Sequence, residues 1–132
     1  FVFGASGIES ITLPTLLVTA ALDATTTEAD DGDPTWAQLA RASSDNRRVD
    51  FATAGHFTFS DACSLPLGIG DNDGCSDAFI PAAQAHVAVD AYALAFLDRH
   101  LRGVDSNAAL LDGELSIEPD VTLSIGTGPV TP

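Results

Sequence analysis

The spacing of hydrophobic residues in two stretches of the chain predicts strands. Residues 11–22 form a nearly continuous apolar run with β-branched members, which is typical of a strand buried on both faces of a parallel sheet. Residues 47–54 alternate instead, because Val49, Phe51 and Thr53 are separated by polar or small residues. This alternation predicts a strand with one more exposed face, placed nearer the edge of the sheet.

A short helix is expected between these strands and a long helix after them. Asp33 followed by Pro34 is typical of a helix start, with the acid as N-cap and proline at the first helical position. The polar run 43–46 ends this short helix. The long helix covers 82–102 and stops at Gly103, with cations in its last turn. Apolar residues at helical spacing predict one stripe on it: Ala83, Val87, Ala91, Leu94, Leu97 and Leu101.

The order strand, helix, strand predicts an α/β fold built on a parallel, right-handed βαβ unit. We expect one domain, or part of one, over 1–132, with its core in 8–103. The tail 104–132 either adds a short strand or lies along the surface. In a parallel pair both strands end at the same edge of the sheet, so Asp23 and His56, which follow the two strands, are expected to lie at one edge.

The charge of the chain excludes some classes of function. Nineteen acids face five arginines and no lysine, which gives a net charge of −14. A protein that binds nucleic acid through phosphates needs a basic surface, and so does one that docks on anionic lipid. No apolar run approaches the ~20 residues of a transmembrane helix. The chain contains no methionine and opens without a basic signal region, so we expect a processed product or a fragment.

Two cysteines, Cys63 and Cys75, flank a loop rich in glycine, aspartate and proline. Such a pair predicts a local disulfide and a secreted or periplasmic protein; the alternatives are two reduced thiols or half of a metal site. No metal or other cofactor is expected. The acidic runs 28–33 and 71–74 lack the ligand spacing of a calcium loop and are interpreted as solvated loops.

Asp23 and His56 are the candidate catalytic residues. In a Ser-His-acid mechanism the acid accepts the Nδ1 proton of the imidazole while the histidine deprotonates the serine. The alternatives are a structural histidine, and Asp50 or Asp61 as the acid. The nucleophile is missing: Ser6 lacks the flanking glycines of a G-x-S-x-G elbow, and this motif occurs nowhere in the chain. His86 and His100, on the long helix, are expected at the surface.

Three stretches carry a resemblance to a known family. Residues 11–23 (ITLPTLLVTAALD) resemble the strand of α/β-hydrolases that ends in the acid. Residues 54–61 (AGHFTFSD) are similar to the histidine loop of the dienelactone-hydrolase-like and platelet-activating-factor-acetylhydrolase-like branch, and residues 92–103 (YALAFLDRHLRG) to its closing helix. The sequence departs from the family where Ala20 and Ala21 replace a usual glycine, and in lacking the serine motif.

The resemblance implies the C-terminal part of a serine esterase or lipase-like hydrolase that acts on small esters or lipids through an acyl-enzyme. Its serine and the remaining strands would come from an upstream segment or a separate chain, without which the sheet is incomplete and the chain inactive. Phe57 and Phe59 are candidates for the substrate pocket, with one of them expected in the core. Trp36 is interpreted as packed, and a disulfide between the two cysteines would hold His56 in place. The alternative is a non-catalytic binding or structural domain on a hydrolase-like scaffold.

Overall fold

A parallel pair of strands forms the centre of the protein. The computed structural model describes residues 7–8, 10–66, 68 and 70–129. Strands β1 (Leu16–Ala20) and β2 (Arg47–Phe51) pair in parallel, with Leu16 opposite Arg47. Helix α2 (Asp33–Ala42) connects them, so the predicted βαβ unit is confirmed. The first strand is shorter than 11–22, and at its end the chain bends at Ala21 and Leu22, whose amides donate to the carbonyls of Phe51, the last residue of β2, and of Ala54.

A third strand makes the sheet mixed rather than parallel. Strand β3 (Val121–Ile125) pairs antiparallel with β2, and the order is β1-β2-β3. Of the two possibilities for the tail, a short strand is therefore the one found. It also places β2 in the centre, so the prediction of an edge position for this strand is wrong. The result is a small mixed α/β domain.

The polar positions of β2 alternate because they serve a buried charge network rather than solvent. Arg48 is 8% exposed and donates from Nε to Thr19 Oγ1 at 2.9 Å and from Nη1 to Asp33 Oδ1 at 2.8 Å. Its Nη2 atom pairs with Glu28 in the π-helical turn Glu28–Gly32. Asp50 also lies within 3.6 Å of the guanidinium. Ion pairs thus allow the charged side chain of Arg48 to be buried between the sheet and α2. The alternating sequence pattern alone predicts that this side chain is exposed to solvent.

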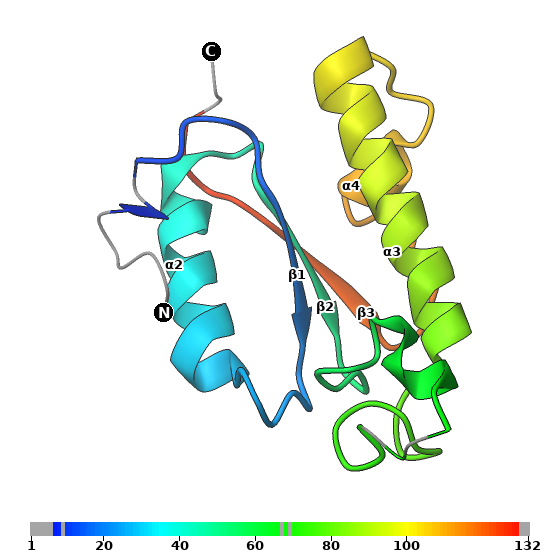
Figure 1. The fold of residues 1–132 in the computed structure, drawn as a ribbon. Coiled ribbons are helices and arrows are strands. Elements are labelled where there is room, and N and C mark those ends of the chain that lie inside the picture. Colours follow the sequence, from blue (N-terminus) through cyan, green and yellow to red (C-terminus); the bar gives the residue numbers. More distant parts are fainter. Residues whose placement is uncertain (1–6, 9, 67, 69, 130–132) are drawn as a thin grey trace.

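Two helices cover the opposite faces of the sheet (Figure 1). Helix α2 lies on one side, and helix α3 (Ala82–Leu97) lies on the other, with the short α4 (Ala108–Leu111) beside it. A π-helical turn extends α3 over Asp98–Arg102, and the helix stops at Gly103 with a φ of 63°, as the sequence predicts. Within the described part of the chain, no helix is long and apolar enough to cross a membrane.

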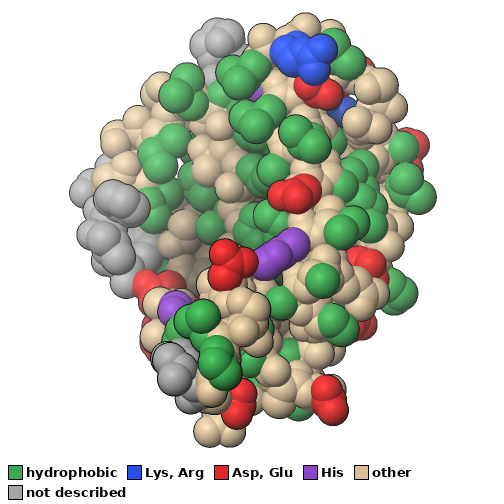
Figure 2. Space-filling model, turned by 45° about the vertical axis from the view of Figure 1, so that its right-hand side comes forward, with side chains coloured by type: hydrophobic (Ala, Val, Ile, Leu, Met, Phe, Trp, Pro, Cys, Tyr) green, Lys and Arg blue, Asp and Glu red, His purple; other side chains and the backbone are tan. Residues whose placement is uncertain are grey.

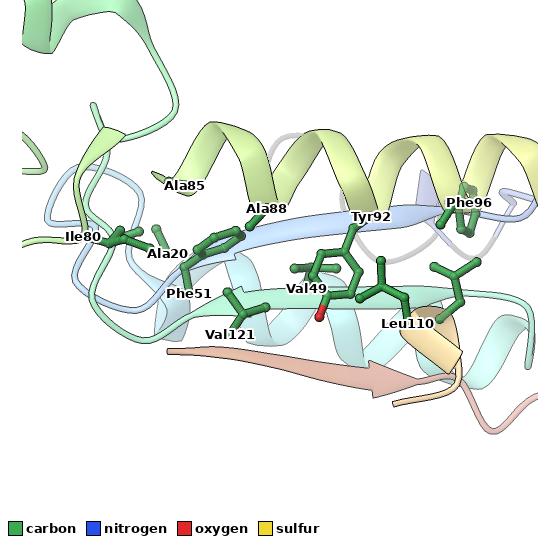
Figure 3. Close-up of a cluster of buried hydrophobic side chains, with 13 residues drawn as sticks. Ala20, Val49, Phe51, Ile80, Ala85, Ala88, Tyr92, Phe96, Leu110 and Val121 are labelled. Carbon is green, nitrogen blue, oxygen red and sulfur yellow. The ribbon is translucent and has the colours of Figure 1, made fainter. Parts of the chain in front are cut away.

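The core lies between α3 and the sheet (Figure 3). Tyr92 and Ala88 of the helix point toward Val49 and Phe51 of β2, and all four are at most 1% exposed. Small residues such as Ala85 and Ala95 let the helix approach the strands closely. Leu110 of α4 and Val121 of β3 close the same cluster. This cluster gives the described residues a core of their own.

The predicted stripe of α3 faces away from this core. Val87, Leu94 and Leu101 are 61%, 62% and 76% exposed, so most of this stripe lies at the surface. The helix is apolar on nearly all sides, and periodicity therefore does not tell which side packs. The alanine-rich side packs on the sheet, and the larger aliphatic side chains remain outside. Figure 2, turned so that the α3 side comes forward, shows hydrophobic side chains spread over this face between scattered acids.

Candidate functional site

Asp23 closes a tight turn three residues after β1. Its Oδ1 atom accepts hydrogen bonds from the amides of Thr25 (2.8 Å) and Thr26 (2.7 Å). Its Oδ2 atom accepts one from Thr26 Oγ1 at 2.7 Å. An aspartate that bonds to backbone amides two and three residues ahead fixes its own turn. The side chain is 11% exposed, so the carboxylate is held in one orientation with little contact with water.

His56 follows β2 and meets this carboxylate. Its Nδ1 atom lies 3.0 Å from Asp23 Oδ2 and 3.4 Å from Thr26 Oγ1. The preceding residue, Gly55, lets the loop of His56 pack closely on the backbone of Asp73, because a Cβ at this position would lie 2.6 Å from that backbone. The structure therefore brings together the two candidate catalytic residues at the carboxyl ends of neighbouring parallel strands, where the βαβ topology predicts them.

The electrostatics of the pair fix the roles of the imidazole nitrogens. Burial opposes ionisation of Asp23, but hydrogen bonds from Thr26, His56 and Thr25 outweigh it and lower the pKa of this carboxyl below 3.8. An ionised carboxylate can only accept, so Nδ1 of a neutral His56 carries the proton and Nε2 carries the free lone pair. The histidine side chain is 35% exposed, and among the described residues Nε2 has no hydrogen-bond partner. A ring held in this way is arranged to act as a base through Nε2.

Asp73 is a functional candidate that the sequence interpretation missed. Its Oδ1 atom accepts from the amides of His56 (2.9 Å) and Ala24 (3.1 Å), and Oδ2 accepts from Thr25 Oγ1 (2.9 Å). It is 9% exposed, so the interpretation of 71–74 as a solvated acidic loop is wrong at this residue. Burial raises its pKa, yet these three donors outweigh burial and lower it below 3.8. No local pattern marks the residue, since its partners come from two distant loops.

The disulfide predicted between Cys63 and Cys75 is present, with a Cα–Cα distance of 4.9 Å. It closes the loop that carries Asp73, and this loop packs directly on the histidine loop. The amide of Phe57 donates to Asp73 O at 2.9 Å, and Thr58 Oγ1 donates to Gly74 O at 3.2 Å. The loop therefore bonds to the two residues that follow His56.

The two phenylalanines after His56 have different surroundings. Phe57 packs edge-on against the imidazole, with ring centroids 5.1 Å apart. Phe59 packs edge-on against Phe51 of the core at 5.0 Å and also lines a groove of about 220 Å³. Asp23 and Thr26 line the same groove, which runs along β1. One aromatic thus touches the base, and the other joins the core to the adjoining groove.

The alternative acids are engaged elsewhere. Asp50 accepts from Thr19 Oγ1 at 2.6 Å in the Arg48 network, and Asp61 is exposed at the start of the 3-10 turn Asp61–Ser64. Trp36 is half-buried on α2, which agrees with its interpretation as a packed residue.

The two helix histidines differ from expectation. His86 and His100 are half-buried rather than at the surface, and their Nε2 atoms are buried without a hydrogen-bond partner among the described residues. Burial is the largest influence on His100 and lowers its pKa below 6.5. His100 also packs on Phe96, with centroids 4.4 Å apart.

The described residues supply no serine to His56. Among the described residues, the hydroxyl within bonding distance of the ring is Thr26 Oγ1, but it donates to the carboxylate and reaches Nδ1 rather than Nε2. Ser6, which the sequence interpretation rejected as a nucleophile, lies outside the described residues. The site is thus an acid–histidine pair without a nucleophile in the described part of the chain. Comparisons with protein families, curated proteins and solved structures find no match.

Proposed function

We propose that this chain is the acid- and histidine-bearing part of a serine esterase or lipase-like hydrolase. The observation that carries the proposal is the bond of 3.0 Å between His56 Nδ1 and Asp23 Oδ2 at the carboxyl ends of two parallel strands. This is the arrangement that a general base and its orienting acid require. It leaves Nε2 available to a group that approaches from outside the described residues.

In this proposal, His56 Nε2 takes the proton of a serine hydroxyl as the serine oxygen attacks the carbonyl carbon of an ester. Asp23 holds the resulting imidazolium. The imidazolium then gives the proton to the leaving alcohol, and an acyl-enzyme remains. In the second half His56 takes a proton from water, the hydroxide attacks the acyl group, and the serine oxygen leaves with that proton. No cofactor is needed for these steps.

The serine would come from an upstream segment or a separate chain, because no G-x-S-x-G motif occurs in this sequence. Two features of the structure support such a partner. Strand β1 pairs on one side only among the described residues, which leaves an edge that can take another strand. The outer side of α3 exposes Val87, Leu94 and Leu101, which a covering segment would bury. The partner would also complete the groove along β1, whose wall at Phe59 suits the apolar part of a small ester or lipid.

The test compares the chain alone with the chain together with the polypeptide encoded upstream of it or co-purifying with it. We expect hydrolysis of p-nitrophenyl esters only from the combination. We also expect a fluorophosphonate probe to label the partner, and His56→Ala to abolish both signals. His86→Ala, which removes a histidine of α3 that makes no recorded bond to the pair, is the matched control. Hydrolysis by the 132-residue chain alone that is lost in His56→Ala would refute the missing-nucleophile part of the proposal.

The second candidate is a non-catalytic binding or structural domain. The core between α3 and the sheet favours it, because the described residues bury a cluster of their own. Native mass measurement separates the candidates. A folded, monodisperse species of 13.6 kDa with no companion favours the domain, whereas a companion that reacts with fluorophosphonate favours the enzyme. The disulfide is compatible with a secreted or periplasmic site for either.

A further inference from the structure

We propose that Asp73 is a positioning residue that locks the loop of the acid to the loop of the base. The inference rests on the proposed function, since it concerns the same Asp23–His56 pair. The carboxylate of Asp73 is buried between two loops that follow different strands. One of its oxygens accepts from both loops at once, from the amide of Ala24 beside the acid and from the amide of His56 itself.

Both carboxylate oxygens of Asp73 accept hydrogen bonds from donors in the two loops that carry Asp23 and His56. Oδ1 receives two backbone amides, at 2.9 and 3.1 Å, and Oδ2 receives Thr25 Oγ1 at 2.9 Å. At 9% exposure, this carboxylate has little water to replace a lost partner. A buried ionised group with such bonds holds its donors firmly, because moving one of them leaves a charge unsatisfied.

The backbone around Asp73 leaves little room for movement. Asp73 O accepts the amide of Phe57 at 2.9 Å. A Cβ on Gly55 would lie 2.6 Å from Asp73 C, and a Cβ on Gly74, whose φ is 125°, would lie 2.6 Å from the amide of Thr58. The two segments therefore pack backbone to backbone on both sides of the carboxylate. The disulfide closes this segment and limits how far it can move away.

The position of Asp73 affects which nitrogen of the His56 imidazole carries the proton. The Asp23 carboxylate holds neutral His56 with its proton on Nδ1, and this requires the two loops to stay in register. If Asp73 sets that register, its removal lengthens the bond and frees the ring to place its proton on either nitrogen. A residue that only contributed stability would leave the protonation of the folded ring unchanged.

The test measures the ¹⁵N shifts of His56 in the labelled 132-residue chain at neutral pH. We expect the unaltered chain to show a protonated Nδ1 and an unprotonated Nε2. Asp73→Ala should move both shifts toward a mixture of the two forms. Asp73→Asn keeps one acceptor oxygen for the amides and should move them less. Thr25→Val removes only the bond to Oδ2, so it provides a mild variant if Asp73→Ala does not fold.

The control is Asp71→Asn, which removes the same charge from an exposed position in the same loop and should leave the shifts unchanged. Identical shifts in the unaltered chain and in folded Asp73→Ala would overturn the proposal. If Asp73→Ala does not fold, identical shifts in both Asp73→Asn and Thr25→Val would overturn it as well.

An activity measurement separates this proposal from the proposed function. In the chain combined with its serine-bearing partner, Asp73→Ala should lower kcat by about 10- to 100-fold with little change in KM, as expected for misplacement of a catalytic group. Absence of esterase activity from the combination would refute the hydrolase but leave the ¹⁵N result standing. Full activity of Asp73→Ala with an unchanged pH profile would refute the positioning role alone.

Discussion

His56 Nδ1 lies 3.0 Å from Asp23 Oδ2, although the two residues are 33 positions apart in the chain. The parallel pairing of β1 with β2 brings them together, because each follows its strand at the same edge of the sheet. The Asp23 carboxylate also accepts hydrogen bonds from the amides of Thr25 and Thr26, and these bonds fix its orientation toward His56. The pair is thus a product of the βαβ topology and of one self-bonded turn.

Asp23→Asn tests whether this bond serves catalysis. The amide keeps the shape of the side chain but can donate to Nδ1, which favours the tautomer with its proton on Nε2 and removes the base. We expect kcat of the chain combined with its serine-bearing partner to fall by about 10⁴-fold, as for the equivalent change in a Ser-His-Asp enzyme. Asp61→Asn, at an exposed site, is the matched control. Equal losses in the two variants would count against a role for Asp23.

The βαβ unit, the long helix, the disulfide and the Asp23–His56 neighbourhood follow from local patterns and simple topology. The buried side of α3 could not be predicted in this way. Val87 and Ala88 are both apolar, and only the packing of the helix in the folded chain determines which of them faces the sheet. The central position of β2 could not be predicted either, because an arginine such as Arg48 is expected to face solvent unless its carboxylate partners are known. Asp73 is hidden for the same reason: its three donors lie 17, 48 and 49 residues away.

Acid should destabilise the folded chain partly through Asp73. Its pKa is lower in the folded protein than the ordinary 3.8. A carboxyl group with a depressed pKa contributes stability that is present above the unfolded pKa and is lost as the pH falls through the folded pKa. We therefore expect the difference in unfolding free energy between the unaltered chain and Asp73→Asn to be largest near neutral pH and to shrink below about pH 4. Urea unfolding at several pH values measures it.

The control in the acid series is Asp71→Asn, which is exposed and should run parallel to the unaltered chain. A gap between Asp73→Asn and the unaltered chain that stays constant from neutral to acid pH would show that the charge of Asp73 is not the source of its stabilising effect.

Reduction of the disulfide should lower stability and loosen the site together. Cys63 and Cys75 are 12 positions apart, and the chain entropy of a loop of this size gives about 3 kcal/mol of stabilisation. We expect urea unfolding of the reduced chain to show a loss of this order. The ¹⁵N shifts of His56 should move in the same direction as in Asp73→Ala. The Cys63→Ser/Cys75→Ser variant should match the reduced chain and should not respond to reductant. A reduced chain with unchanged shifts would limit the bridge to a role in stability.

The exposed side of α3 gives the sharpest test of whether a partner covers this chain. Leu94 is 62% exposed, so Leu94→Asp removes an apolar side chain from the surface without opening the core. We expect its free energy of unfolding to stay within about 0.5 kcal/mol of the unaltered value, and self-association at high concentration to fall. Binding to the serine-bearing partner should weaken at least tenfold, because a buried unpaired charge would then oppose the contact. Unfolding curves, sedimentation and titration of the partner measure the three effects.

Ala88→Asp, on the buried side of the same helix, should instead unfold the chain. Unchanged affinity of Leu94→Asp for a partner that does bind would move the contact surface away from this face of the helix.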